Sequence, residues 1–227
     1  MPRIERGLVD GFIYHVLNRG NGKQEIFHKD QDYKVFIELM QEAKKKHPVK
    51  IFEYCLMPNH FHMVMMVVQA EEFIRYMQWL MTSHVRKYHA HYGSTGHIWQ
   101  GRYKSFIIQE GGHLLTVLRY VIRNPVRAGL VKSAKEWRWA SHNGSVNPAS
   151  HNLLLDKVPI ELPEKWDEYV NEPLTDAEIE RLHSSITRGS PYGETDWREK
   201  VSKELRLEST IRPRGRPRKD GGGYKKK

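Results

Sequence analysis

Residues 50–68 read KIFEYCLMPNHFHMVMMVV, and this stretch decides the fold. It holds two largely apolar runs with aromatic and β-branched residues, a composition typical of buried strands. Pro58 and Asn59 separate the runs and predict a tight turn. We therefore interpret the stretch as a β-hairpin, with one strand at 50–57 and the next at 60–68.

The hydrophobic periodicity on either side of the hairpin predicts five further elements. They are strands at 12–19 and 102–109, and helices at 30–46, 71–92 and 113–124. The order β-α-β-β-α-β, followed by one more helix, matches a ferredoxin-like split βαβ arrangement. We expect an α+β fold, with an antiparallel sheet and helices on one face.

The hydrophobic periodicity weakens after Gly144, and residues 145–165 have a composition typical of a linker. Two short helices are predicted at 174–186 and 195–207, capped by Thr175 and Thr195. We expect three parts along the chain: a domain at 1–144, a linker with a small helical extension at 145–210, and a flexible basic tail at 211–227.

The charge of the chain indicates a polyanionic partner. The formal net charge is +10, and residues 211–227 supply +7 of it, with eight basic residues against one acidic residue. Nucleic acid is the usual partner of such a protein. The single cysteine excludes an internal disulfide, and no apolar run approaches the roughly 18 residues of a membrane span. We expect a cytoplasmic, nucleoid-associated protein without a signal peptide or membrane contact.

His60 and His62 lie two residues apart on a predicted strand, so their side chains share one face while Phe61 points into the core. Two parallel imidazoles can bind one metal ion, and the alternative is a hydrogen-bonded pair without a ligand. His89 and His91 have the same spacing. They belong to a helix end, where such residues point about 200° apart and cannot readily chelate an ion.

The helix at 113–124 places Tyr120 away from its aliphatic stripe, so we expect this phenol outside the core face and exposed. Asn124 follows one turn later and lies beside it. Pro125 ends or kinks the helix after Asn124. The alternative for this pair is an ordinary solvated helix face.

Together these residues resemble a known family. The strand with His60-Phe61-His62 is followed by YVIRNPVRAGLV at 120–131, with RGN at 19–21 and IWQGRY at 98–103 in support. This combination resembles the single-tyrosine HUH transposases, and more narrowly the REP-associated tyrosine transposases, relatives of the IS200/IS605 enzymes. The resemblance covers about residues 8 to 144.

The resemblance implies a function. His60 and His62 would hold a divalent ion, Mg²⁺ or Mn²⁺, with Asn124 as the third ligand, and Tyr120 would be the nucleophile. The family acts on single-stranded DNA near hairpin-forming palindromes and needs no ATP. Attack by the phenol would give a 5′-phosphotyrosine and a free 3′-OH that can later reverse the step. We expect a DNA endonuclease and strand transferase, working as a monomer or homodimer.

Basic residues in the domain and the tail are candidate DNA contacts. They are Arg19, Arg102, Lys104, Arg123, Arg127, Arg212, Arg214, Arg216 and Arg218. The tail segment Arg214-Gly215-Arg216-Pro217 resembles an AT-hook core, in which glycine permits close backbone approach and two arginines follow a narrow minor groove. The alternative is a solvated tail and plain surface charges.

Three rival interpretations stay open on the sequence. Tyr103, at the start of a strand, could be the nucleophile instead of Tyr120. The fold and tail could bind hairpin or AT-rich DNA without any chemistry. The two histidines could serve a metal hydrolase that forms no covalent tyrosine adduct. The presence of His60, His62 and Tyr120 together favours the strand transferase.

Overall fold

The computed structural model describes residues 7–143 and 154–212, and a four-stranded antiparallel sheet organises them. The strands are β1 (Ile13–Arg19), β2 (Lys50–Met57), β3 (His60–Met66) and β4 (Lys104–Ile108), in the order β2-β3-β1-β4. β2 and β3 form the predicted hairpin, and β1 lies between β3 and β4. The fold class expected from the sequence is confirmed.

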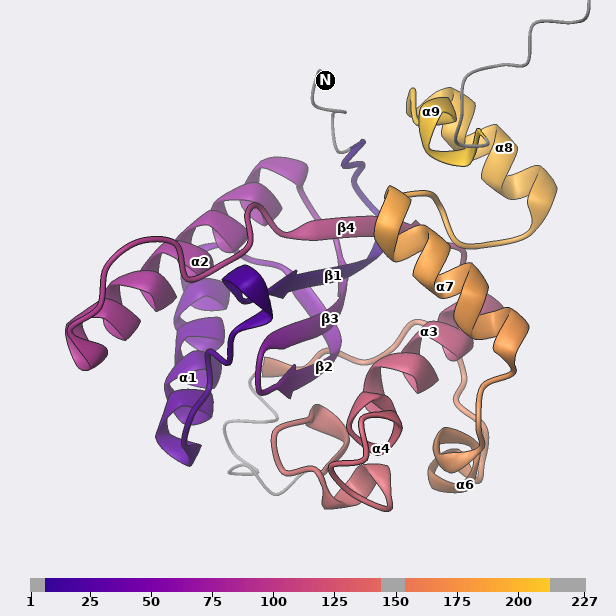
Figure 1. The fold of residues 1–227 in the computed structure, drawn as a ribbon. Coiled ribbons are helices and arrows are strands. Elements are labelled where there is room, and N and C mark those ends of the chain that lie inside the picture. Colours follow the sequence, from indigo (N-terminus) through magenta and orange to yellow (C-terminus); the bar gives the residue numbers. More distant parts are fainter. Residues whose placement is uncertain (1–6, 144–153, 213–227) are drawn as a thin grey trace, which may run out of the picture.

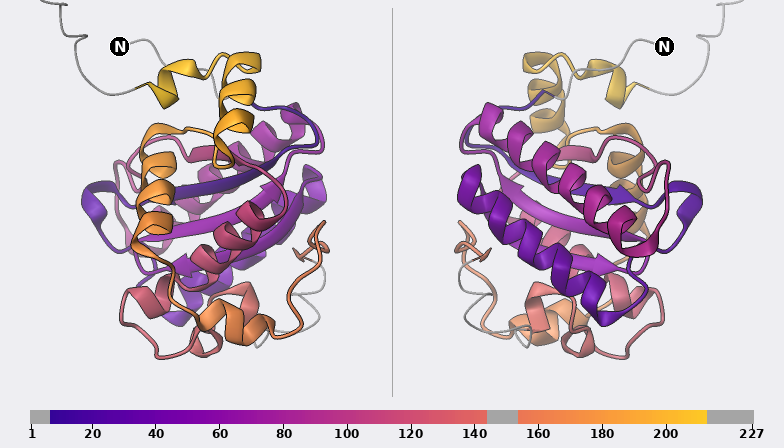
Figure 2. Two further views of the ribbon diagram at one scale, coloured as in Figure 1. Left: turned by 90° about the vertical axis from the view of Figure 1, so that its right-hand side faces the viewer. Right: turned by 90° about the vertical axis from the view of Figure 1, so that its left-hand side faces the viewer.

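Two long helices, α1 (Asp30–Lys46) and α2 (Ala70–Tyr92), cover one face of the sheet (Figure 1). They lie side by side in front of the strands in the right-hand view of Figure 2. Phe36 of α1 and Phe61 of β3 are completely buried between helices and sheet, and their ring centroids are 5.4 Å apart. Phe61 therefore points into the core, as strand alternation requires.

The other face of the sheet is covered by α3 (Gly112–Ile122), with α7 (Asp176–Arg188) beside it in the left-hand view of Figure 2. Leu114, Leu118 and Val121 pack in one buried cluster with Val64 and Phe106 of the strands. The sequence predicted helices on one face of the sheet. This description holds for α1 and α2 only, because α3 and α7 cover the second face. The reason is that β2 and β3 are buried along nearly their whole length, and strands buried on both sides need cover on both faces.

Shorter elements complete the described chain. They are the 3₁₀ turns η1 (Asn21–Lys23), η2 (Ala134–Glu136) and η3 (Ser141–Asn143), and the helices α4 (Asn124–Arg127), α6 (Trp166–Asn171), α8 (Thr195–Glu204) and α9 (Glu208–Ile211). Thr175 caps α7 in a capping box with Glu178, as predicted. Glu194 takes the cap position of α8, so Thr195 is the first residue of that helix and not its cap.

The C-terminal extension docks on the outer edge of β4. Tyr192 forms a parallel bridge with Ile108, and its backbone N–H donates to the Ile107 carbonyl over 2.8 Å. The Tyr192 carbonyl accepts from the Gln109 N–H over 2.9 Å. Leu182 and Tyr192 share the buried cluster of α3. The extension thus protects an open sheet edge, while the division into three parts stays a prediction.

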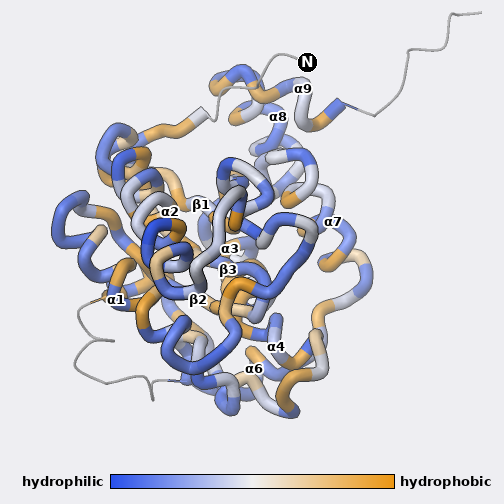
Figure 3. The backbone as a smooth tube through the Cα atoms, turned by 60° about the vertical axis from the view of Figure 1, so that its left-hand side comes forward, coloured by the Kyte–Doolittle hydropathy of each residue, from blue (hydrophilic) through white to orange (hydrophobic). Residues whose placement is uncertain are grey.

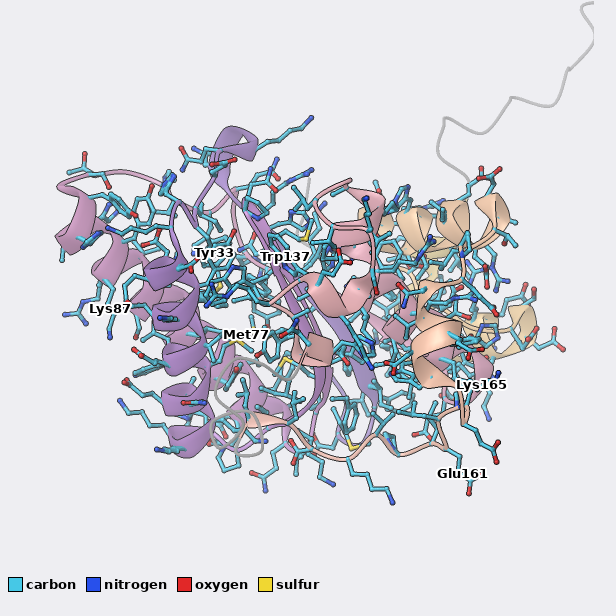
Figure 4. All side chains as sticks on the ribbon, turned by 90° about the horizontal axis from the view of Figure 1, so that it is seen from below. Tyr33, Met77, Lys87, Trp137, Glu161 and Lys165 are labelled. Atoms are coloured by element: carbon cyan, nitrogen blue, oxygen red, sulfur yellow. The ribbon has the colours of Figure 1, made fainter. Side chains whose placement is uncertain are left out.

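The distribution of side chains follows this architecture. In Figure 3 hydrophobic segments alternate with hydrophilic ones along the helices, as expected of elements with one buried side. Figure 4 labels Tyr33 and Met77, which are buried, and Trp137, which is half-buried, while Lys87, Glu161 and Lys165 extend from the periphery. No helix in the described part of the chain is long and apolar enough to cross a membrane.

Glu53 is an acidic residue inside this interior. Its side chain lies on β2 next to the bulge between Ile51 and Glu53, and only 8% of it is exposed. Its Oε1 atom has no hydrogen-bond partner within residues 7–143 and 154–212. Burial raises the pKa of the carboxyl group to about 8. Glu53 is therefore largely protonated in the folded protein at neutral pH.

We predict that Glu53→Gln changes the pH dependence of stability. The folded pKa lies above the unfolded one, so the contribution of Glu53 is fully present below about pH 4.5 and is lost as the pH rises toward 8. Relative to wild type, the free energy of unfolding of the variant should rise by roughly 3 kcal/mol between pH 5 and pH 8.

Urea titrations at both pH values measure this difference. Glu38→Gln, at an exposed position of α1, is the matched control and should follow wild type. Parallel pH profiles for Glu53→Gln and wild type would contradict the prediction.

Candidate active site around Tyr120

His60 and His62 begin β3 and face α3, on the side of the sheet opposite Phe61. Their ring centroids are 4.9 Å apart, with the ring planes nearly perpendicular. His62 is 3% exposed and His60 is partly exposed. Strand geometry therefore brings the two imidazoles together as predicted. His89 and His91 diverge, since His89 contacts Ser94 and Gly96 while His91 contacts Lys29.

A third histidine, His15 of β1, joins the pair. β1 runs antiparallel beside β3, with Leu17 opposite His62 and His15 opposite Val64. The Nε2 atom of His15 lies 2.8 Å from Nδ1 of His62, and the two rings are parallel within 6°. Sequence reasoning missed His15. The signal that could have found it is a histidine inside the apolar alternation of the first strand.

Tyr120 lies against these histidines and not at the surface. Its side chain is 3% exposed, and its ring stands edge-on to His62 and His15, with centroids 5.8 and 6.1 Å away. The expectation of an exposed phenol was wrong. The aliphatic stripe marks only part of the buried surface of α3, because the extension covers the helix as well, and even Arg119 is 7% exposed.

The break in the helix that follows Tyr120 determines the position of the Asn124 side chain. α3 ends at Ile122 and Asn124 begins α4, so the helix stops two residues earlier than predicted. Pro125 has no N–H to donate to the last turn of α3. The amide of Asn124, which is 2% exposed, donates instead to the carbonyls of Tyr120 and Val121 over 3.0 and 3.4 Å.

Arg127 contacts both the phenolic oxygen and the ring of Tyr120. Its Nη2 atom donates to the phenolic oxygen over 3.1 Å and to Oδ1 of Asn124 over 2.7 Å. Its Nη1 atom lies 3.0 Å from Nε2 of His183, which α7 supplies. The guanidinium carbon also lies 4.7 Å from the centre of the Tyr120 ring. His183 was not predicted, because nothing in the sequence indicates that α7 reaches this site.

The electrostatics keep the imidazoles neutral. Burial, together with Arg19 and Arg127, lowers the pKa of His60 to about 4. Burial and the neighbouring His15 hold the pKa of His62 well below its ordinary value. Burial raises the pKa of the Tyr120 phenol, and Arg127 opposes that rise. The site thus offers two unprotonated imidazoles and a phenol whose ionisation depends on an arginine.

Part of this site suits a divalent ion. The Nδ1 atom of His60 lies 2.6 Å from Oδ1 of Asn59, and Nδ1 of His62 contacts His15. Among the described residues, neither Nε2 atom has a hydrogen-bond partner, so both are available to a ligand. An imidazole held at one nitrogen and open at the other is the usual arrangement of a metal ligand.

Asn124 fits such an ion less directly. Its Oδ1 atom accepts from Arg127, so one of the two lone pairs of the oxygen is engaged and a positive charge lies beside the position that a cation would take. Within the described residues, no group of three or more His, Cys, Asp or Glu side chains is arranged to hold a metal. Two imidazoles and an amide are not a group of that kind, and the metal stays a proposal.

The other predicted residues lie on both faces of the sheet. Tyr103 lies in the cluster on the α1 and α2 side, with its ring 6.2 Å from Phe73, and not with the histidines. Arg19 stands opposite His60 in the strand register. Lys104 shares a sheet face with Phe106, on the side of α3.

The remaining predicted DNA contacts have neighbours other than the phenol of Tyr120 or lie outside the described residues. Arg102 lines a separate pocket along α2 with Met81 and Tyr103. Arg123 neighbours Arg119, which pairs with Glu178 of α7. The backbone carbonyl of Arg212 contacts Arg188. Outside the described residues are Arg214, Arg216 and Arg218.

The family follows from comparison with known proteins. The family model described as "Transposase IS200 like" matches residues 8–124, slightly more than half of the chain. This chain belongs to the IS200-like transposase family. The match ends at Asn124, so Arg127 and His183 lie outside the segment that the family model covers.

Two relatives extend this result. A curated protein of Haemophilus influenzae named as a REP-associated tyrosine transposase is 25% identical over 122 residues, which is 49% of this chain and 69% of the relative. A solved structure of a REP-associated tyrosine transposase bound to a REP hairpin superimposes with a TM-score of 0.52. That match has 16% identity and covers 78% of this chain and all of the other, so it shows the shared fold. The resemblance read from the sequence is confirmed.

We predict that Arg127→Met raises the pKa of the Tyr120 phenol further. The positive charge of Arg127 and its hydrogen bond favour the phenolate, and their removal leaves only the charge of Arg19 to oppose the effect of burial. NMR titration of ¹³Cζ-labelled tyrosine in the full-length protein follows this ionisation.

Arg181→Met is the matched control, because Arg181 lies 5.4 Å from the ring of Tyr192 on the same face. It should move the Tyr192 resonance and leave Tyr120 unchanged. A Tyr120 titration that is identical in wild type and Arg127→Met would refute the assignment of Arg127.

Proposed function

We propose that this chain is a metal-dependent transposase and endonuclease that cleaves and rejoins single-stranded DNA near hairpin-forming palindromic repeats. The observation that carries the proposal is the position of Tyr120, whose ring meets His62 at 5.8 Å while Arg127 reaches its phenolic oxygen at 3.1 Å. A phenol, two neutral imidazoles and a cation converge at one point. These are the groups that a tyrosine nucleophile at a phosphodiester requires.

Hairpin DNA as the substrate is supported from outside this chain. The similar solved structure is a REP-associated tyrosine transposase bound to a REP hairpin. The formal net charge of +10 agrees with a polyanionic partner. Arg19, Lys104 and Arg127 stand on or near the α3 side of the sheet and would meet the phosphates beside the scissile bond.

The proposed reaction is an exchange of phosphoesters. The oxygen of Tyr120 attacks the scissile phosphorus and loses its proton, and the bond from phosphorus to the 3′ oxygen breaks. The 3′ oxygen takes up a proton and leaves as a free hydroxyl, while the strand on the 3′ side of the cut stays attached through its 5′ phosphate as a phosphotyrosine. One phosphoester replaces another, so a later 3′-OH can reverse the step and join strands without ATP.

His60, His62 and Asn124 are the residues that would hold Mg²⁺ or Mn²⁺. When bound, such an ion polarises the scissile phosphate and stabilises the charge that develops on its oxygens. Arg127 has two tasks in this scheme. It stabilises the phenolate before attack, and it releases the Asn124 oxygen when it turns toward a phosphate.

The direct test is covalent capture. Purified protein is mixed with Mn²⁺ and a hairpin oligonucleotide that carries one label at its 5′ end and another at its 3′ end. We expect an SDS-resistant adduct that carries only the strand 3′ of the cut. Tyr120→Phe should abolish the adduct, and His62→Ala should reduce it by at least about a hundredfold.

Tyr103→Phe is the matched control and should form the adduct at a rate within a few fold of wild type, since Tyr103 lies on the opposite side of the sheet. Binding without any adduct, across several hairpins and both metals, would support a non-catalytic DNA-binding protein instead. An adduct that survives Tyr120→Phe would move the nucleophile to another residue.

The tail has a separate role in this proposal. The segment Arg214-Gly215-Arg216-Pro217 would bind A·T-rich duplex DNA beside the hairpin through the minor groove. The double variant Arg214→Ala, Arg216→Ala should weaken binding to a hairpin with an A·T-rich duplex flank about tenfold, and leave adduct formation on a bare hairpin unchanged. Fluorescence anisotropy with A·T-rich and G·C-rich flanks measures this. Equal losses of affinity with A·T-rich and G·C-rich flanks would mean that the tail binds DNA only by general charge attraction.

A further inference from the structure

His15 is the residue of the candidate site that the proposed chemistry leaves without a task. It is completely buried at the centre of the sheet, under the site. Its ring touches His62, meets Phe106 edge-on at 4.9 Å, and lies 6.1 Å from Tyr120. Its Nδ1 atom has no hydrogen-bond partner in the described part of the chain. A buried polar atom without a partner costs stability, and an aliphatic residue would suit a central strand better.

His60 shows what a partner behind an imidazole does. Its Nδ1 atom lies 2.6 Å from Oδ1 of Asn59, and a carbonyl oxygen can only accept a hydrogen bond. The proton of neutral His60 therefore sits on Nδ1. The lone pair is left on Nε2, the atom free to bind an ion.

His62 faces the same choice with a different partner. One proton lies between His62 Nδ1 and His15 Nε2, which are 2.8 Å apart. If His15 donates that proton, His62 must carry its own proton on Nε2, and this atom cannot bind a metal. If His62 donates, its Nε2 lone pair is open, as in His60.

We propose that His15 is a positioning residue that accepts the Nδ1–H of His62 and so holds Nε2 of His62 ready for the divalent ion. The inference rests on the proposed function, because it assumes that His62 is a metal ligand. In this arrangement the two imidazoles are equivalent. Asn59 holds one from the turn before β3, and His15 holds the other from the neighbouring strand β1. The rings of His15 and His62 are parallel within 6° and meet at these two nitrogens, which fixes the direction in which the lone pair points.

The test compares two substitutions in the full-length protein. His15→Gln keeps an acceptor oxygen near the position of Nε2, whereas His15→Met has a similar length and no such acceptor. Mn²⁺ affinity is measured without DNA, from the electron paramagnetic resonance signal of free Mn²⁺. We expect His15→Met to weaken binding about 10- to 100-fold. His15→Gln should stay within about threefold of wild type.

His84→Met is the matched control. His84 is also buried, at 3% exposed, and its Nδ1 atom likewise has no partner among the described residues, but it packs against Phe36 and Trp99 on the other face of the sheet. It should bind Mn²⁺ like wild type even if its melting temperature falls. Wild-type affinity in His15→Met would overturn the inference.

The tautomer is a second readout, and it needs no substitution. ¹⁵N NMR of the imidazoles in metal-free wild-type protein should show His62 protonated at Nδ1, and protonation at Nε2 would overturn the inference even if His15→Met fails to fold. The two proposals fail differently. Equal Mn²⁺ affinity of wild type and His62→Ala would refute the proposed metal site itself. Tighter Mn²⁺ binding by wild type than by His62→Ala, with no loss of affinity in His15→Met, would refute only the role of His15.

Discussion

The antiparallel pairing of β1 with β3 is the constraint on which the candidate site depends. β1 lies in the middle of the sheet, between β3 and β4, and its register sets Arg19 opposite His60 and Leu17 opposite His62. The same register brings His15 within 2.8 Å of His62. A shift of one residue would turn His15 to the face of α1 and α2 and break this contact. The alternation of β1 favours this register, because Tyr14 and Val16 pack in the core with α1 and α2 while Ile13 packs in the cluster with α3.

A second constraint is the break between α3 and α4. Pro125 cannot close the last turn of α3, so the Asn124 amide caps the carbonyls that the break leaves open. The short turn of α4 then returns Arg127 to the phenol of Tyr120. One local backbone event therefore assembles the nucleophile, the amide and the cation. It also couples them, because Arg127 holds the phenolic oxygen and the Asn124 oxygen with the same nitrogen.

The extension takes part in the site instead of standing apart from it. Tyr192 adds a bridge to the edge of β4, and Leu182 packs with the cluster under α3. This docking carries α7 across the sheet face and sets His183 3.0 Å from Arg127. The docking adds to the burial of Tyr120, whose ring centroid lies 6.3 Å from that of His183. Burial makes the ionisation of the phenol depend on the nearby arginines, and on Arg127 most, since water no longer stabilises the phenolate.

The sequence by itself determined the main elements and two pairs of residues in the site. Alternation in residues 60–68 put His60 and His62 on one face, and helical spacing put Asn124 one turn after Tyr120, because both relations are local and follow from backbone geometry. Tertiary structure decided the rest. His15 reaches His62 across 47 positions and His183 reaches Arg127 across 56, through strand register and helix docking that no local pattern encodes. The burial of Tyr120 was misjudged for the same reason: a helical wheel shows which face of α3 is apolar, but only the packed chain shows how many neighbours cover it.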